Sequence, residues 1–447
     1  MTTPPSIELI IQVSTGFVIQ RSPGNKLWII CLAWLFLFAQ PSSAQHLIEL
    51  TPSLLVRETY DDNIYLDSTD EQSDYMTAVS PSLSLHLLSE NTHLELLYAP
   101  TFVWYNQEDQ NNTVRHSGTA TLGHDLTQYL TFDLSDTYIK SEEPMEETEE
   151  VENVRNTRDT YQRNAFSASL GCLFGPEDLL TVGFRHSLLK NEDPTVDDGK
   201  IRNPFSTVTY WFNLKDGVEL DYEYTDAIFW RGDEEDAGDD YTGHGAGMRF
   251  IHRLTRHASG FLAYRFTNRH FDGKTEDYST HDVSIGLEQA FAQDLSISVG
   301  GGYFVQKNDE SDDQTGYSYN ASVQKGFERG SFFIGGTGGW DEAYLEAERR
   351  GFSRYWSIEA RLEYQIVAPL AAYGGWSYRL DKGKGDEGED RDWGTWRRSC
   401  GLTWTFHQWF SLALDYTYAD REDDVEAEGY TDHRFMLNLT ASKLWQW

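Results

Sequence analysis

The sequence is poor in cysteine, in basic residues and in long apolar runs. Only Cys31, Cys172 and Cys400 occur in 447 residues, which excludes a disulfide-rich scaffold. Lys and Arg number 36 against 72 Asp and Glu, so the net charge of −36 excludes a basic nucleic-acid-binding surface. After residue 44 no stretch approaches twenty apolar residues, which excludes a transmembrane helix.

The N-terminal segment has the layout of a secretory signal. Arg21 and Lys26 precede an apolar run over 27–39, and small residues follow over 41–44. We therefore predict a signal peptide with an extended n-region over 1–44 and a single mature domain over 45–447. The long n-region is equally consistent with a start codon further along the chain.

Aromatic residues are abundant although the chain as a whole is polar. Phe, Trp and Tyr make up 14% of the residues, with 25 Tyr and 14 Trp, yet the mean hydropathy is −0.56. Aromatic girdles around a polar lumen produce this combination. We expect Cys172 and Cys400 to be lipid-facing or packed residues rather than a bridge or a metal pair.

The C-terminal residues alternate between apolar and polar, which is the period of a β-strand with one apolar face. The apolar positions are Phe435, Leu437, Leu439, Ala441, Trp445 and Trp447, interrupted by Lys443. A chain that ends on such a strand with a final aromatic residue is similar to bacterial outer-membrane β-barrels. In those proteins the closing strand carries the folding signal, so Phe435, Leu437, Leu439, Trp445 and Trp447 are its candidates here, and the barrel-assembly machinery is an expected partner.

The same alternation recurs through residues 45–447, separated in turn by short and long polar connections. Nine short turns and ten longer loops predict about twenty antiparallel strands, with eighteen as the alternative. Parity alone fits a soluble sandwich equally well, but the signal segment, the terminal strand and the number of segments favour an all-β, up-and-down transmembrane barrel. The expected location is the bacterial outer membrane, with the longer loops outside. Pro52, Pro81 and Pro100 predict bulges or rims in early strands.

The first predicted hairpin carries a family resemblance. Residues 57–66 read Arg-Glu-Thr-Tyr-Asp-Asp-Asn-Ile-Tyr-Leu, and 72–75 and 79–85 complete a strand, an Asp-Asp-Asn loop and a Ser-Pro returning strand. This resembles the opening hairpin of the β-barrel porin 2 family, which overlaps barrels linked to exopolysaccharide export. The resemblance implies an outer-membrane barrel, and less directly a polysaccharide cargo and periplasmic export partners; it lends no catalytic residue.

Acidic clusters dominate the predicted loops. Seven glutamates lie within 142–152, and further clusters lie within 233–240, 309–313 and 386–392. The preferred interpretation is a solvated, self-repelling surface, and the alternative is a set of Ca²⁺ sites that bridge to lipopolysaccharide. Asp61, Asp62 and Asn63 are predicted to turn the chain, with Ca²⁺ binding again as the alternative. We expect no other cofactor.

The polar parity of the strands carries charges of both signs. The candidate lumen-lining residues are Arg57, Arg185, Glu219, Asp221, Glu223, Arg265, Glu359, Arg361, Glu363, Tyr373, Arg379 and Asp415. They fit a selectivity surface for a hydrophilic solute and equally a ladder of salt bridges in a plugged barrel.

The sequence contains neither Gly-x-Ser-x-Gly nor His-Glu-x-x-His, so we expect no enzyme. The favoured function is a channel or export conduit, and the alternative is a non-conducting structural or assembly barrel. A lipid hydrolase is a lesser alternative, which would need a Ser–His pair on the outer wall. The expected partners are outer-membrane lipid and lipopolysaccharide, the assembly machinery, polysaccharide and periplasmic export components.

Overall fold

The computed structural model describes residues 47–147, 152–154, 157–194, 196–230, 240–273, 275–292, 294–345, 351–384, 390–425 and 428–447. The predicted signal peptide lies outside these residues. The wall is built from β1 (Leu47–Asp61), β2 (Asp74–Leu88), β3 (Thr92–Tyr105), β4 (Thr113–Thr127), β5 (Leu130–Ser141), β8 (Tyr161–Leu173), β9 (Leu179–Asn191), β10 (Asp198–Trp211), β11 (Asp216–Trp230), β12 (Tyr241–Thr255), β13 (Ala258–Phe271), β14 (Tyr278–Ala292), β15 (Leu295–Asn308), β16 (Gln314–Phe327), β17 (Gly330–Ala343), β18 (Gly351–Val367), β19 (Leu370–Lys384), β20 (Asp390–His407), β21 (Phe410–Asp423), β22 (Tyr430–Ser442) and β23 (Trp445–Gln446). A 3₁₀ turn, η1 (Asp109–Asn111), and a small hairpin of β6 (Met145–Glu147) and β7 (Glu152–Val154) lie in the connections.

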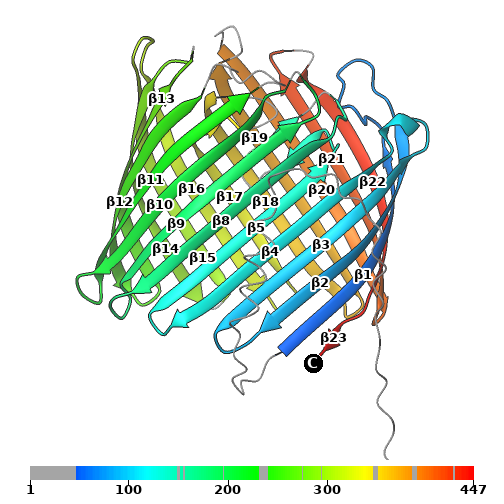
Figure 1. Ribbon diagram of the computed structural model, residues 1–447, viewed down its shortest axis with the longest axis horizontal. Helices are drawn as coiled ribbons and strands as arrows, with labels where there is room; N and C mark the ends of the chain where they lie inside the picture. The colour runs from blue at the N-terminus through cyan, green and yellow to red at the C-terminus, as the bar shows by residue number, and fades with distance from the viewer. Residues whose placement is uncertain are drawn as a thin grey trace, which may run out of the picture. The chain divides into compact units, whose positions relative to one another are not determined.

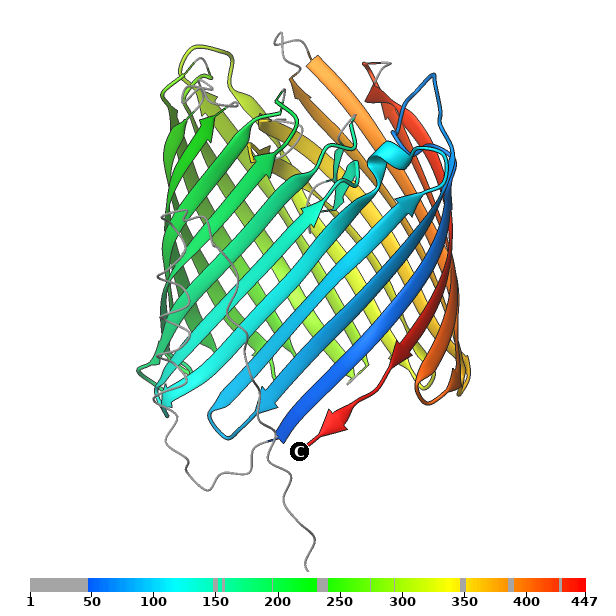
Figure 2. The same ribbon diagram turned by 45° about the vertical axis from the view of Figure 1, so that its right-hand side comes forward.

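The sheet closes into a barrel (Figure 1). Each wall strand pairs antiparallel with the next, and β1 pairs with both β2 and β22, so twenty strands and the short β23 leave no free edge. Figure 2 shows β22 and β23 beside β1. The predicted twenty-strand, up-and-down antiparallel barrel is confirmed, rather than the eighteen-strand alternative.

Short and long connections separate to opposite rims, as predicted. The nine connections of two to five residues lie at the rim where β1 begins and β23 ends, which we call the short-turn rim. The other ten connections, of five to nineteen residues, lie at the other rim, the long-loop rim. In outer-membrane barrels the longer loops face the outside of the cell and the short turns face the periplasm.

The two faces of each strand differ in polarity. In β22, Leu437 is 46% exposed and faces outward, whereas the next residue, Asn438, is 9% exposed and faces inward. Phe435, Leu439, Trp445 and Trp447 share the outward face, as predicted. Within the described residues, no helix is long and apolar enough to cross a membrane.

Proline positions explain where the ladder is interrupted. The β2–β3 pairing stops between Val79↔Phe102 and Leu83↔Tyr98, where Pro81 and Pro100 would face each other. A second gap separates β22 from β23 opposite Pro52. Proline has no N–H to donate, so these prolines mark gaps within the strands rather than the strand rims.

Candidate functional site

The predicted lumen residues all lie on the inner face, and several are linked to one another. The Tyr373 hydroxyl donates to Asp415 Oδ1 at 2.8 Å, and Asn438 Nδ2 donates to Asp415 Oδ2 at 2.7 Å. Arg57 Nε then donates to Asn438 Oδ1 at 2.7 Å. This chain of hydrogen bonds runs along the inner face of the barrel, from β19 by way of β21 and β22 to β1.

Glycine on the intervening strand makes the first contact possible. Gly401 of β20 lies between Tyr373 and Asp415, and a Cβ there would overlap both side chains. Because glycine leaves that space free, the tyrosine ring lies flat along the wall instead of projecting into the lumen.

A second group of predicted residues repeats this arrangement on β9–β13. Arg265 Nη2 lies 2.9 Å from Glu223 Oε1, and Arg185 Nη1 lies 3.6 Å from Glu223 Oε2. The contact from β13 to β11 passes over β12, where a Cβ at Gly247 would overlap the Asp221 carboxylate. Opposite charges therefore neutralise one another along the wall.

The other candidates are placed on the same face but differ in environment. Arg361 lies 2.9 Å from Glu359 and its side chain is 72% exposed, so this pair is open to the lumen. Arg379, by contrast, is packed near the long-loop rim, 2.7 Å from Asp381 and 3.0 Å from Asp341. Glu219 lies opposite Arg249, and Glu363 opposite Tyr373, in the strand register.

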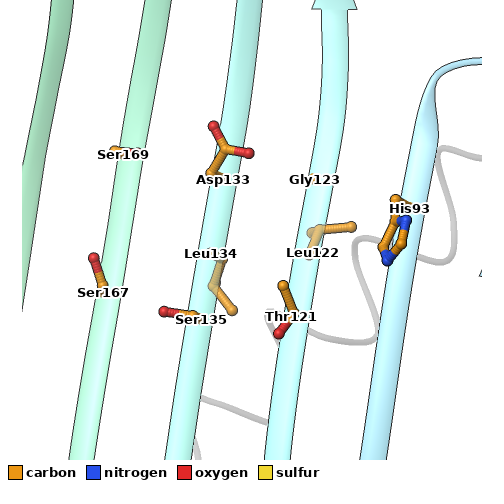
Figure 3. A pocket seen from close by; sticks show the side chains of 9 residues that line it. All are labelled: His93, Thr121, Leu122, Gly123, Asp133, Leu134, Ser135, Ser167 and Ser169. Carbon is orange, nitrogen blue, oxygen red and sulfur yellow. The ribbon is translucent and has the colours of Figure 1, made fainter. Parts of the chain in front are cut away.

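Two hollows on the inner wall are rich in hydroxyl groups. One, of about 380 Å³, is lined by His93, Thr121, Asp133, Ser135, Ser167 and Ser169 among others (Figure 3). The other, of about 440 Å³, includes six serine and threonine side chains of β1–β4 together with Arg57, Arg115, Glu143 and Arg434. Hydroxyls at this density suit contact with hydrated, hydroxylated solutes.

The segment after β5 folds inward, which corrects one prediction. Glu142 and Glu143 were expected in a solvated acidic surface, but Glu142 is only 2% exposed. Arg115 Nη2 lies 2.6 Å from Glu142 Oε1 and 2.5 Å from Glu143 Oε1. The Arg115 guanidinium therefore contacts both carboxylates; the glutamates at 149 and 150 lie outside the described residues.

Arginines from distant parts of the chain complete this network. Arg434 Nη1 lies 3.3 Å from Glu143 Oε2, and Arg158 donates to the Ile64 carbonyl at 2.7 Å and to the Tyr105 hydroxyl at 2.5 Å. Burial alone would raise the pKa of Glu143, but the guanidinium groups of Arg115, Arg158 and Arg434 hold that pKa well below its usual range. The segment is thereby held against β1, β3, β4 and β22.

A second segment folds inward after β17. Tyr344 packs against Tyr241, Phe271 and Tyr278 of β12–β14, with ring centroids 5.1 Å from Tyr241 and 5.4 Å from Phe271. The Leu345 carbonyl accepts from Arg163 of β8 at 3.1 Å. Since β8 and β17 are far apart around the ring, this segment crosses the lumen near the long-loop rim.

The Asp61–Asp62–Asn63 motif turns the chain, as predicted. Asp61 Oδ1 accepts from the Asn63 N–H at 2.9 Å. The carboxylates of Asp61, Asp62 and Asp432 come within 4.8 Å of one another. However, Arg434 Nε lies 3.1 Å from Asp61 and 2.8 Å from Asp432, so an arginine already contacts two of the three carboxylates.

A Ser–His–acid contact occurs on the inner wall. Ser84 Oγ lies 2.8 Å from His86 Nε2, and His86 Nδ1 lies 3.3 Å from Glu95. Residue 84 is paired in the ladder with both β1 and β3, so the neighbouring backbone N–H groups are not arranged as an oxyanion hole. The pair also faces away from lipid, so it does not supply the outer-wall site that a lipid hydrolase would need.

Sequence reasoning missed both inward segments and the cations that hold them. Arg115, Arg158 and Arg434 stand on no recognisable motif, and Arg434 lies 291 residues from its partner Glu143. Neither Arg115 nor Arg434 was among the predicted lumen residues, although the alternating pattern around each places it on the polar face of its strand.

Comparison with known proteins supports the fold alone. No family model and no curated protein matches the chain. Among solved structures, the siderophore receptor PirA of Pseudomonas aeruginosa has a TM-score of 0.51 at 10% identity, over 88% of this chain and 80% of that one. The ferric enterobactin receptor of the same organism gives 0.51 at 9%, over 88% and 81%. The outer-membrane protein OpdK gives 0.39 at 12%, over 89% and 99%.

A closed antiparallel barrel with an apolar outer band and a polar interior satisfies every wall hydrogen bond internally and exposes apolar groups to lipid. The chain is therefore a transmembrane β-barrel of the bacterial outer membrane.

Proposed function

We propose that the barrel is a passive channel for hydrophilic solutes, narrowed near the long-loop rim by the two inward segments. The observation that carries this proposal is the arrangement of the inner wall. Several of its charged side chains are linked to neighbouring polar side chains and lie along the sheet over glycines such as Gly247 and Gly401. A twenty-strand barrel is wide enough to hold an aqueous lumen unless loops fill it.

The favoured cargo is a polysaccharide or its fragments. The hydroxyl-rich hollows on the inner face of β1–β5 and β8 favour the binding of a solute with many hydroxyl groups. In addition, the opening hairpin resembles a family that overlaps exopolysaccharide exporters. In export, periplasmic components would deliver the chain to the short-turn rim.

The second candidate is a non-conducting structural or assembly barrel. The specific observation in its favour is that the residues after β17 reach the opposite wall, where Arg163 holds the Leu345 carbonyl. If the segment closes the lumen completely, the barrel serves as an anchor for other proteins rather than as a pore.

Single-channel conductance in planar bilayers separates the two candidates. The channel predicts a large and steady conductance that falls when oligosaccharides are added to one side. The same recording with and without Ca²⁺ tests whether cations order the acidic loops. No conductance under either condition would overturn the channel and leave the structural barrel.

A further inference from the structure

Four hairpins carry the same Tyr–His contact on the outer face of the barrel. A tyrosine hydroxyl lies 2.8–2.9 Å from a histidine Nδ1 in each. The pairs are Tyr98–His116, Tyr222–His244, Tyr264–His281 and Tyr416–His433. Three of the histidines belong to a repeated Tyr-x-x-His sequence that begins the returning strand, at Tyr241, Tyr278 and Tyr430.

The repeat places these pairs at one height. Each histidine is the fourth residue of its strand counted from the long-loop rim, in β4, β12, β14 and β22. Three residues of strand span about 10 Å, so the imidazoles lie just inside that rim. Because tyrosine and other amphipathic rings concentrate at the membrane–water interface, this height corresponds to the head groups of the outer leaflet.

One of the four pairs has an arginine beside it. Arg398 of β20 is opposite Tyr418 of β21 in the register, and Tyr418 is opposite His433 of β22. The guanidinium carbon of Arg398 lies 5.3 Å from the centre of the Tyr418 ring and 5.9 Å from that of Trp396. The His433 ring lies 4.8 Å from the Tyr418 ring, so these side chains form a continuous outer surface.

Arg398 has no carboxylate partner among the described residues, although it is exposed on the outer face. Several inner-wall arginines, such as Arg115 and Arg265, have such partners. A cation held by aromatic rings keeps its N–H donors directed outward. In a chain of net charge −36, an unpaired guanidinium two strands away from His433 in the register complements an anionic lipid.

We propose that one patch of the outer face binds a phosphate group of a phosphorylated glycolipid in the outer leaflet. The patch consists of Trp396, Arg398, Tyr418 and the Tyr416–His433 pair. Arg398 supplies the charge and two parallel donors, as guanidinium groups do for phosphate. If the tyrosine hydroxyl donates to Nδ1, His433 Nε2 carries a proton that can be donated to the same head group. The aromatic rings contact the sugar and the start of the acyl chains.

The test compares lipids and variants on the protein purified in detergent micelles. Binding of bisphosphorylated lipid A and of the same lipid with both phosphates removed is measured by native mass spectrometry. The wild type is expected to bind the phosphorylated lipid more tightly. Arg398→Gln is expected to weaken that binding about tenfold, which corresponds to the loss of one charge-assisted contact, and His433→Phe by a smaller factor.

Matched controls come from the same chain. Arg397→Gln removes an equal charge from the adjacent, inward-facing residue. His244→Phe removes an equivalent Tyr–His pair. The residues paired with His244 on the two neighbouring strands are Tyr224 and Asn268, and neither is a cation. Both should bind lipid A as the wild type does. Heat-modifiable electrophoretic migration confirms that each variant is folded.

Two results would overturn the proposal. One is equal binding of phosphorylated and dephosphorylated lipid A, which is measured on the wild type and so does not depend on any variant. The other is that folded Arg398→Gln binds phosphorylated lipid A as tightly as the wild type does, or that Arg397→Gln weakens this binding to the same extent. Neither result bears on conductance, so the site and the proposed channel are tested separately.

Discussion

Glu143 connects three arginines and is the single carboxylate on which the inward segment after β5 most depends. Substitution Glu143→Gln should cost on the order of 3 kcal/mol of docking free energy, because it removes one carboxylate partner from three buried arginines at once. We expect a larger and noisier single-channel conductance, since the segment would leave the wall. Asp294→Asn, which removes an exposed turn carboxylate beside Lys325, is the control; an unchanged conductance in Glu143→Gln would show that this segment does not narrow the pore.

The lowered pKa of Glu143 fixes the sign of its pH dependence. A carboxylate whose pKa is depressed by folding stabilises the fold fully above its unfolded value of about 4.3, and that contribution is lost as the pH falls toward the folded value. We expect conductance to be constant from pH 8 to pH 5 and to rise only in stronger acid. A transition near pH 7 would assign the gating to another group.

Arg57 is an inner-wall cation that is held by an amide rather than by a carboxylate. Its Nε contacts Asn438, and no carboxylate of the described residues lies within ion-pair distance. Arg57→Gln should therefore increase the preference of the pore for cations, measured as a shift of reversal potential in a salt gradient. Arg398→Gln makes the same charge change on the lipid-facing side and should leave the reversal potential where it is.

Among the elements, the segment after β17 is expected to narrow the lumen most directly. Tyr344 is 8% exposed and packs against side chains of β12, β13 and β14. Tyr344→Ala removes an aromatic anchor of about 3–5 kcal/mol, and we expect a higher conductance and weaker block by oligosaccharides. Tyr317→Ala, which trims a tyrosine that is 75% exposed on the outer face, should change neither quantity.

The terminal element β23 is predicted to act in assembly. Trp447 exchanges backbone hydrogen bonds of 3.0 and 3.1 Å with Ile48, which joins the last residue to the first strand. Deletion of 445–447 should reduce the fraction of barrel that reaches the folded, heat-modifiable form in cells. Trp409→Ala, in a short turn, is the control for loss of an aromatic residue at that rim; normal assembly of the truncated chain would place the folding signal elsewhere.

Strands and their faces could be predicted because each depends on residues two apart. Alternation in 435–447 was enough to assign Leu437 outward and Asn438 inward. The inward segments could not be predicted in this way. Glu143 meets Arg434 across the closing seam of the barrel, and an isolated run of glutamates reads as a solvated surface until its distant arginines are placed.

At the scale of the whole molecule, charge is divided between wall and loops. The inner wall is largely neutralised by ion pairs, so much of the net charge of −36 lies in the connections at the long-loop rim. Loop charges act on ions through the solvent and are screened within about 10 Å at 0.1 M salt. We expect cation selectivity that is strong at 0.01–0.1 M salt and nearly absent at 1 M; selectivity that survives 1 M salt would place its origin in the narrow part of the lumen.

The glycines that allow inner side chains to lie flat also make the bore adjustable. Where Gly401 separates Tyr373 from Asp415, a single larger residue would lift the ring off the sheet and into the solute path. The aperture is thus set by a few positions that contribute no side chain of their own. Graded replacement at Gly401 and Gly247 would convert the barrel into a family of nanopores that share one scaffold and differ in the size of molecule they admit.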